Sequence, residues 1–183
     1  PDEGSSDTGR PIDAARDPAG DGANDGSRDA RRWRVDFSLA LFNRSGKYQI
    51  GQEIISDNAG LIDGVYYWRK RATTPPTGLT ARLLGKAEQL EHGARMAASD
   101  RRCPAGRRKH RWLHLDPLTV LHRRPMRGDV VLVHDMGPLT HPSLFAPGVE
   151  KAYRFAYQIL AQSAALPVFV SQTSQREYGN LFA

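Results

Sequence analysis

The chain has 183 residues, of which 39% are hydrophobic, and its formal net charge at pH 7 is +6. This length suits one folded domain with a tail, and the single cysteine, Cys103, excludes an internal disulfide and a zinc site built on several cysteines. No apolar run in the sequence approaches the ~20 residues that span a bilayer, and the N-terminal stretch lacks the basic-then-apolar pattern of a secretory signal. We therefore expect a cytoplasmic protein.

The first 30 residues differ in composition from the rest of the chain. They hold eight acidic side chains and three arginines, a net charge of −5, so the remainder carries +11. They contain no aromatic residue, and Ile12 is their one large aliphatic side chain. Such a segment cannot bury enough apolar surface to offset the entropy lost on folding. We predict a disordered acidic leader over 1–30 and a basic folded domain over 31–183.

A strand and a glycine-containing turn open the predicted domain. Apolar residues alternate over 32–42, which predicts the first strand. The turn that follows, over 43–51, contains Gly46 and Gly51, which would let its backbone approach a ligand and its amides face an anion or a hydroxyl. Without a complete dinucleotide-binding motif, two glycines fit an ordinary turn equally well. Weak helical spacing comes next, and residues 61–68 favour a second strand.

A helix and a run of cations follow the Thr-Thr-Pro-Pro break. Leucines and alanines at intervals of three and four residues predict a helix over 79–98. The segment 101–111 then has six permanent positive charges in eleven residues. It is typical of a solvated loop, and it also suits contact with anionic lipid headgroups or another polyanion. Nucleic acid is the less favoured polyanion, because Trp112 is the one aromatic residue that borders the run.

The sequence is organised around the stretch 128–145, GDVVLVHDMGPLTHPSLF. Residues 129–133 predict a strand buried on both faces of a parallel sheet, and His134 and Asp135 follow at its carboxyl end. Ligands of open α/β sheets bind outside the carboxyl ends of the strands, so this pair is the first candidate for chemistry. The two side chains are equally suited to ending the strand and bonding loop amides. The glycine and prolines that come next predict a loop before any helix begins.

Three further elements complete the predicted domain. A short strand over 111–115 would deliver His114 to the same edge of the sheet, a helix is expected over 148–163, and a strand over 166–170 ends beside Ser171. A serine or threonine at that point would cap a last helix. The alternation of strands and helices predicts an α/β fold: a Rossmann-like parallel sheet with helices on both faces.

The order of these pieces resembles the N-terminal half of the retaining glycosyltransferases of family four, the "group 1" type, which have the two-domain GT-B fold. The resemblance covers 33–183. It is carried by the strand that ends in His-Asp at 134–135, the Pro-Leu-x-x-Pro-x-x-Phe loop at 138–145, and the Val-Ser pair at 170–171 before a capped helix. It implies that a sugar is transferred from a nucleotide-sugar donor to a glycan or lipid-linked acceptor, with retention of configuration, in the synthesis of an envelope polysaccharide.

The resemblance also implies roles for particular residues. The catalytic candidates are His134 and Asp135, and the substrate-binding candidates are Gly46, Gly51, His114 and Ser171. His134 would contact the donor sugar and help to stabilise developing positive charge, while the two glycines would lie beside the donor phosphate and the acceptor. His141, next to Pro142, is expected to serve the loop. No cofactor is implied, because the nucleotide-sugar is itself a substrate. No metal site is implied either, because the six histidines are scattered along the chain.

A second, donor-binding domain belongs to the family's pattern and is absent from this sequence, so we expect the chain alone to be inactive. We also expect peripheral contact between 101–111 and the inner face of the membrane. An alternative from another class is a non-catalytic, basic, Rossmann-like module that binds an anionic membrane surface or nucleic acid.

Overall fold

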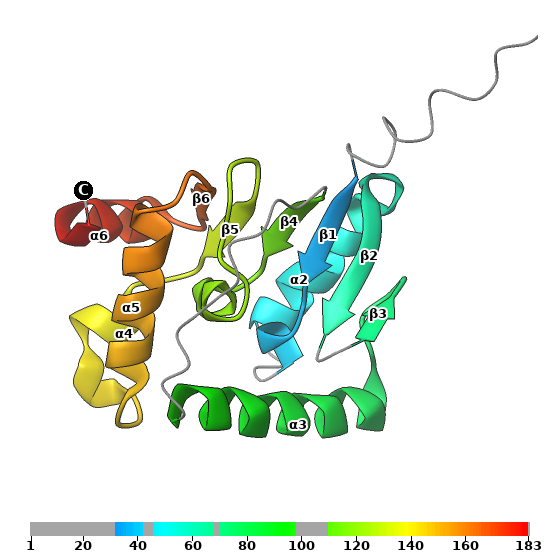
Figure 1. Ribbon diagram of the computed structural model, residues 1–183, viewed down its shortest axis with the longest axis horizontal. Helices are drawn as coiled ribbons and strands as arrows, with labels where there is room; N and C mark the ends of the chain where they lie inside the picture. The colour runs from blue at the N-terminus through cyan, green and yellow to red at the C-terminus, as the bar shows by residue number, and fades with distance from the viewer. Residues whose placement is uncertain (1–31, 42–45, 68–69, 98–109, 183) are drawn as a thin grey trace, which may run out of the picture.

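The computed structural model describes residues 32–41, 46–67, 70–97 and 110–182 (Figure 1), and over 92–97 it describes the backbone alone. The predicted leader over 1–30 and all but the last two residues of the basic run 101–111 lie outside the described residues. Within them, the chain forms an α/β domain built on a mixed, mostly parallel sheet.

The six strands of this sheet pair in the order β3-β2-β1-β4-β5-β6. They are β1 (Trp33–Asp36), β2 (Ile62–Tyr67), β3 (Lys70–Ala72), β4 (Arg111–His114), β5 (Val130–Val133) and β6 (Leu166–Phe169). Every pairing among β1, β2, β4, β5 and β6 is parallel. The edge strand β3 runs antiparallel to β2, so the expectation of a wholly parallel sheet is wrong at this edge.

Helices cover both faces of the sheet, as predicted. The α-helices are α2 (Gly46–Asp57), α3 (Gly78–Ala97), α4 (Gly137–Thr140), α5 (Val149–Ala161) and α6 (Gln172–Phe182). Short 3-10 helices occur at η1 (Leu39–Leu41), η2 (Ala59–Leu61), η3 (Pro117–Leu121) and η4 (Pro142–Leu144). Strand β5 shows the two layers, because Leu132 packs with residues of α2 and α3, whereas Val131 and Val133 pack with Ala156 and Leu160 of α5. This alternation follows from the two-residue period of a strand.

Three predicted boundaries differ from the structure. Strand β1 ends at Asp36, and the expected continuation of that strand is the 3-10 helix η1. Helix α2 begins at Gly46, so the second half of the predicted glycine turn is helical. The predicted loop after β5 contains the short helices α4 and η4, because Pro138 and Pro142 occupy first-turn positions that need no backbone N–H donor.

Close packing of α2 explains why Gly51 is a glycine. A Cβ at this position would lie 2.7 Å from both Leu115 Cδ1 and Phe37 Cε2, and both of those side chains are buried in the core. Gly51 therefore lets the helix approach the sheet, and the expectation that it lines a ligand-binding loop is wrong.

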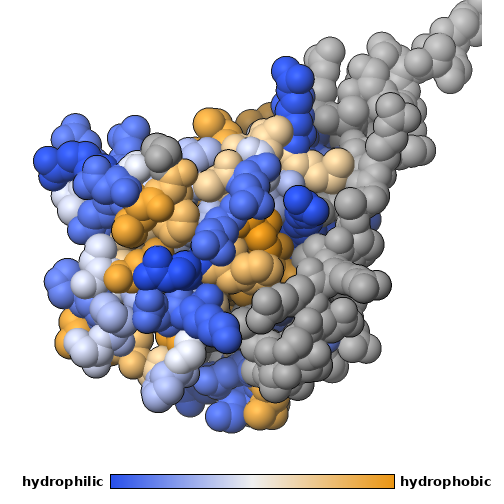
Figure 2. All heavy atoms as spheres, turned by 60° about the vertical axis from the view of Figure 1, so that its left-hand side comes forward, coloured by the Kyte–Doolittle hydropathy of each residue, from blue (hydrophilic) through white to orange (hydrophobic). Residues whose placement is uncertain are grey.

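Several hydrophobic side chains are exposed on the side of the molecule that carries α5, α6 and β6. Figure 2 shows orange hydrophobic groups between blue hydrophilic ones on this side. Alternate residues of the edge strand β6 and the residue after it, Leu166, Val168 and Val170, are exposed. One face of β6 thus lies open, while Phe169 on its other face packs into the core with Tyr178.

Two glycine-to-alanine substitutions in helices are expected to change stability in opposite directions. A Cβ on Gly85 in α3 would lie 2.6 Å from the backbone oxygen of Leu41, whereas nothing lies within 4 Å of a Cβ on Gly179 in α6. We expect Gly85→Ala to lower the free energy of unfolding by about 1–3 kcal/mol through overpacking. Gly179→Ala should raise it by up to about 1 kcal/mol through helix propensity. Urea unfolding measures both, and a Gly85→Ala variant as stable as the wild type or more stable would contradict the close packing of α3 on η1.

Candidate functional site

The candidate site lies at the carboxyl edge of the sheet, where β1 and β4 are neighbours. The chain leaves β1 toward β2 on one side and leaves β4 toward β5 on the other. In open α/β sheets, connections that diverge in this way leave a crevice beyond the carboxyl ends of the two strands, where ligands usually bind, and we call this position the crevice. The side chains at this crevice come from α2, from the segment after β4, from the end of β5 and from α5.

An ion pair with a tyrosine occupies this crevice: the Lys47–Asp116–Tyr153 cluster. The Lys47 ammonium pairs with Asp116 Oδ2, and the two side chains are 20% and 4% exposed. Lys47 Nζ also lies 3.2 Å from the Tyr153 hydroxyl oxygen, and that hydroxyl donates to Asp116 Oδ2 at 3.4 Å. Asp116 Oδ1 accepts from the backbone N–H of Leu118 at 2.8 Å, which caps η3. Burial and the Asp116 charge raise the pKa of Tyr153, so its hydroxyl keeps its proton at neutral pH.

The His134 imidazole lies beside this cluster in a defined tautomer. Its Nε2 is 2.8 Å from the backbone oxygen of Leu115, and a carbonyl oxygen can only accept, so Nε2 carries a proton. In the neutral ring, Nδ1 then bears a lone pair. Within the part of the chain that the structure describes, no hydrogen bond reaches Nδ1. The half-buried ring can therefore accept a hydrogen bond from a hydroxyl group of a ligand.

The environment of His134 favours its neutral form. Burial lowers the pKa of the imidazole below its usual 6.5, and the neighbouring Lys47 charge acts in the same direction. The hydrogen bond to Leu115 and the charges of Asp116 and Asp135 raise the pKa and offset part of this effect. We conclude that the ring is mainly uncharged at neutral pH.

This shift predicts a pH dependence that can be measured directly. In NMR, the His134 ring should titrate with a midpoint below 6.5, the usual value for histidine. Because the unfolded chain binds this proton at a higher pH than the folded chain, stability should fall as the pH drops from about 6.5 through the folded-state pKa. Unfolding free energies of the wild type and of His134→Gln should therefore converge as the pH falls through this window. A midpoint above 6.5 would contradict the buried, neutral ring.

The backbone around His134 is fixed from two helices. The hydroxyl of Ser174, a buried residue of α6, donates to the His134 carbonyl oxygen at 3.0 Å. The hydroxyl of Tyr157, a buried residue of α5, donates to the Asp135 carbonyl oxygen at 2.9 Å. Both bonds span long sequence separations, so the packing of α5 and α6 holds the His134 ring in place.

The other predicted catalytic residue, Asp135, is exposed. Its Oδ1 accepts from the backbone N–H of Gly137 at 2.9 Å, which is the loop-ordering role that the sequence also allowed. His141 is exposed and its Nδ1 lies 2.9 Å from the Thr140 hydroxyl, within the same segment.

Of the four predicted substrate-binding residues, one lies at the crevice. Gly46 is exposed in the first turn of α2, directly before Lys47. His114 is fully buried, with Nδ1 2.8 Å from the Thr119 hydroxyl oxygen, so it is a core residue and the prediction for it is wrong. Ser171 accepts from the backbone N–H of Ser174 at 3.1 Å and so caps α6. The fourth, Gly51, packs α2 against Phe37 and Leu115.

Sequence reasoning did not select Lys47, Asp116 or Tyr153 for the site. Asp116 had a usable signal: it follows a predicted strand and precedes a proline, as the cap of a short helix often does. Lys47 and Tyr153 are single polar residues on helices, and no local pattern separates them from surface residues.

A separate cavity of about 210 Å³ lies near the amino ends of the strands, away from His134. Its lining is mainly apolar, formed by Trp33, Ile54, Asn58, Leu61, Ile62, Leu113 and Val130. No ionisable side chain contributes to this lining, so we place no chemistry there.

Within the described ranges, no three His, Cys, Asp or Glu side chains are grouped so that they could hold a metal ion. Over the same ranges, none of the helices combines the length and the apolar character needed to cross a lipid bilayer. Compared with known proteins, the chain matches no family model, no curated protein and no solved structure.

Proposed function

We propose that residues 31–183 form the acceptor-side domain of a retaining glycosyltransferase of the GT-B type. The enzyme would transfer a sugar from a nucleotide-sugar donor to a glycan or lipid-linked acceptor. The sequence resemblance over 128–178 and the α/β domain with its crevice at the carboxyl edge support the proposal. The observation that carries it is the half-buried His134 ring, whose Nε2–H is held by Leu115 and whose Nδ1 faces no protein donor among the described residues.

A neutral imidazole suits this reaction. As the nucleoside diphosphate leaves, the anomeric carbon of the sugar gains positive charge. A protonated ring beside that carbon would oppose the charge, whereas neutral His134 does not. In this proposal, Nδ1 accepts a hydrogen bond from a hydroxyl of the donor sugar and orients the sugar ring for attack.

The Lys47–Asp116–Tyr153 cluster sets the charge of the acceptor side. The ammonium and the carboxylate offset each other in a partly buried pair, so the crevice has little net charge. The Lys47 ammonium has three N–H groups and donates two of them to Asp116 and Tyr153, so the third could donate to a hydroxyl oxygen of the acceptor. The negative charge of the leaving diphosphate would then be met by the donor-binding domain that the family's pattern places opposite.

A transfer assay on the full-length protein that carries this chain tests the proposal. The protein is incubated with a panel of radiolabelled nucleotide-sugars and with lipid and oligosaccharide acceptors. We expect one donor to label an acceptor, and NMR of the product should show a retained anomeric configuration. A folded protein that transfers no sugar, and whose thermal unfolding no nucleotide-sugar shifts, would contradict the proposal. If that protein instead binds anionic vesicles or DNA in a salt-dependent way, the non-catalytic basic module is the better assignment.

A further inference from the structure

Helix α3 exposes a row of leucines on the side that faces away from the core. Leu79, Leu83 and Leu90 are 69%, 64% and 66% exposed. Their spacing of four and seven residues places them on one face of the helix. The opposite face carries buried Ala81 and Gly85, which pack against η1. The helix therefore has two apolar faces. One packs on the core, and the other, with the three leucines, is exposed.

Cations lie along one edge of this outer face. Arg82 and Lys86 are exposed and, by their helical spacing, lie beside the leucines. The two acidic residues of the helix over 78–91 lie on its other side, Glu88 buried and Glu91 half-buried. An apolar row with Arg and Lys along one edge, and with one acidic side chain buried on the opposite face, suits a helix that lies in the interface of an anionic membrane.

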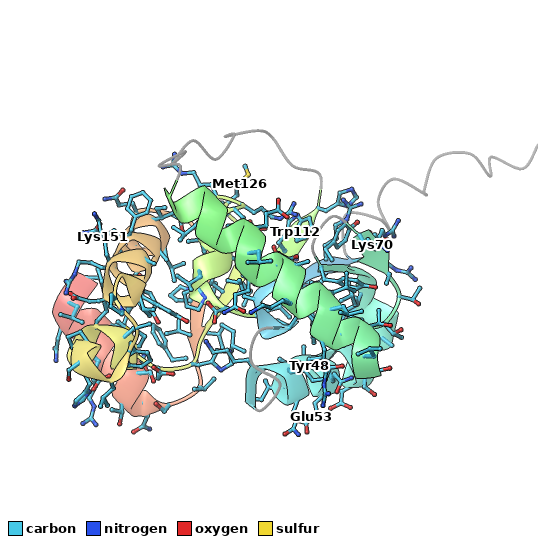
Figure 3. The ribbon with its side chains drawn as sticks, turned by 90° about the horizontal axis from the view of Figure 1, so that it is seen from below. Tyr48, Glu53, Lys70, Trp112, Met126 and Lys151 are labelled. Carbon is cyan, nitrogen blue, oxygen red and sulfur yellow. The ribbon has the colours of Figure 1, made fainter. Side chains whose placement is uncertain are left out.

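The outer face of α3 lies at the same end of the molecule as the candidate site. In Figure 1, α3 runs along the lower edge, toward which the arrowheads of β1 and β2 point. In Figure 3, which views the molecule from that edge, α3 crosses in front of the strands. The segment with α4 and η4 reaches the same edge in Figure 1, and its Leu144 and Phe145 are exposed.

We propose that the outer face of α3 docks the protein on an anionic lipid surface. The leucines enter the headgroup region, and Arg82 and Lys86 pair with lipid phosphates. Docking in this orientation turns the carboxyl edge of the sheet toward the bilayer, so the acceptor is a sugar or phosphate group carried on a lipid. The docking stands on α3 alone, whereas the identity of the acceptor rests on the proposed function.

A lipid surface fits this face better than a second copy of the chain. A stable protein interface buries roughly 800 Å² on each partner, and three leucines of one helix supply a fraction of that area. The face is also cationic, so two identical copies would bring Arg82 and Lys86 of each close to those of the other. Anionic lipid headgroups complement those charges instead.

Vesicle flotation of the full-length chain, without donor or acceptor, tests the docking. The wild type should float with vesicles that contain one third phosphatidylglycerol and should not float with pure phosphatidylcholine. Leu83→Ser with Leu90→Ser should weaken binding by about tenfold per leucine. Arg82→Gln and Lys86→Gln should each weaken it by about fivefold and should reduce its dependence on salt. Because all four side chains are exposed, circular dichroism and the urea midpoint should stay unchanged.

Leu61→Ser is the matched control. Leu61 is 57% exposed, and it lies in η2 directly before β2, at the opposite end of the strands from α3. This variant should bind vesicles like the wild type. Equal binding by the double leucine variant, or equal flotation with neutral and anionic vesicles, would overturn the proposal. A wild type that fails to float but forms a dimer, which the double leucine variant dissociates, would assign the face to a second copy instead.

The docking and the sugar transfer can fail separately. A protein that floats but transfers no sugar would contradict the proposed function and leave the docking intact. A protein that transfers sugar to a soluble oligosaccharide and does not float would overturn the docking alone.

Discussion

Replacing Asp116 by alanine is expected to lower the free energy of unfolding by about 3 kcal/mol. The carboxylate is buried and has three partners among the described residues: the Lys47 ammonium, the Tyr153 hydroxyl and the backbone N–H of Leu118. Its loss leaves a partly buried ammonium without a counter-ion and removes the cap of η3, which alone is worth about 1 kcal/mol. Urea unfolding monitored by circular dichroism gives the value.

Two comparisons separate burial from charge in this result. Glu150→Ala removes a carboxylate from the exposed pair with Arg154, whose atoms are 2.7 Å apart, and it should cost at most about 1 kcal/mol. Asp116→Asn keeps an acceptor for the η3 cap and should fall between the two. Equal losses from Asp116→Ala and Glu150→Ala would show that the Lys47–Asp116–Tyr153 cluster is solvated rather than buried.

His134→Ala is expected to reduce the rate of sugar transfer by the full-length protein about 100-fold without unfolding it. The reason is geometric, since the ring is oriented by Leu115 and no hydrogen bond from the described residues reaches its Nδ1. His134→Asn should restore part of the activity, because its amide lies close to where Nδ1 was. His134→Gln, which reaches toward the Leu115 oxygen, should restore less. Initial rates over a range of donor concentrations separate an effect on kcat from one on KM.

Arg154→Ala is the control variant for these rates. Arg154 is exposed on α5, where it pairs with Glu150, so transfer should stay close to the wild-type rate. If His134→Ala also keeps that rate, the imidazole has no part in the chemistry and the proposed function loses its main support. If His134→Gln is as active as the wild type, the essential contact is the bond to Leu115 rather than Nδ1.

Most strands and helices could be predicted because their signals are local. Strand β5 is a run of β-branched residues, and α5 carries apolar residues at helical spacing, so either can be recognised within a short window. Strand β3 has the sequence Lys-Arg-Ala and exists because β2 offers it a free edge, so no window over 70–72 reveals it. The start of α2 was missed because glycine at 46 and 51 suggested a turn, whereas Gly51 is there to fit against Phe37.

The candidate site was predictable only in part, for a related reason. His134 follows a recognisable strand, and its position at the carboxyl edge follows from the α/β alternation. His114 was chosen by the same rule, but β4 turns its side chain into the core, where Thr119 bonds it. The sequence distances from Lys47 to Asp116 and to Tyr153 are 69 and 106 residues, and no local pattern reports contacts of that range.

Those long separations also bear on how the protein is made. During synthesis, Lys47 emerges first, Asp116 much later and Tyr153 later still, yet the crevice takes its shape only when all three meet. A nascent chain that has completed β1 to β4 therefore possesses four of the six strands and neither Asp116 nor Tyr153. The Lys47–Asp116–Tyr153 cluster should accordingly form in one late step, when α5 docks, and a chain that ends before α5 should lack it.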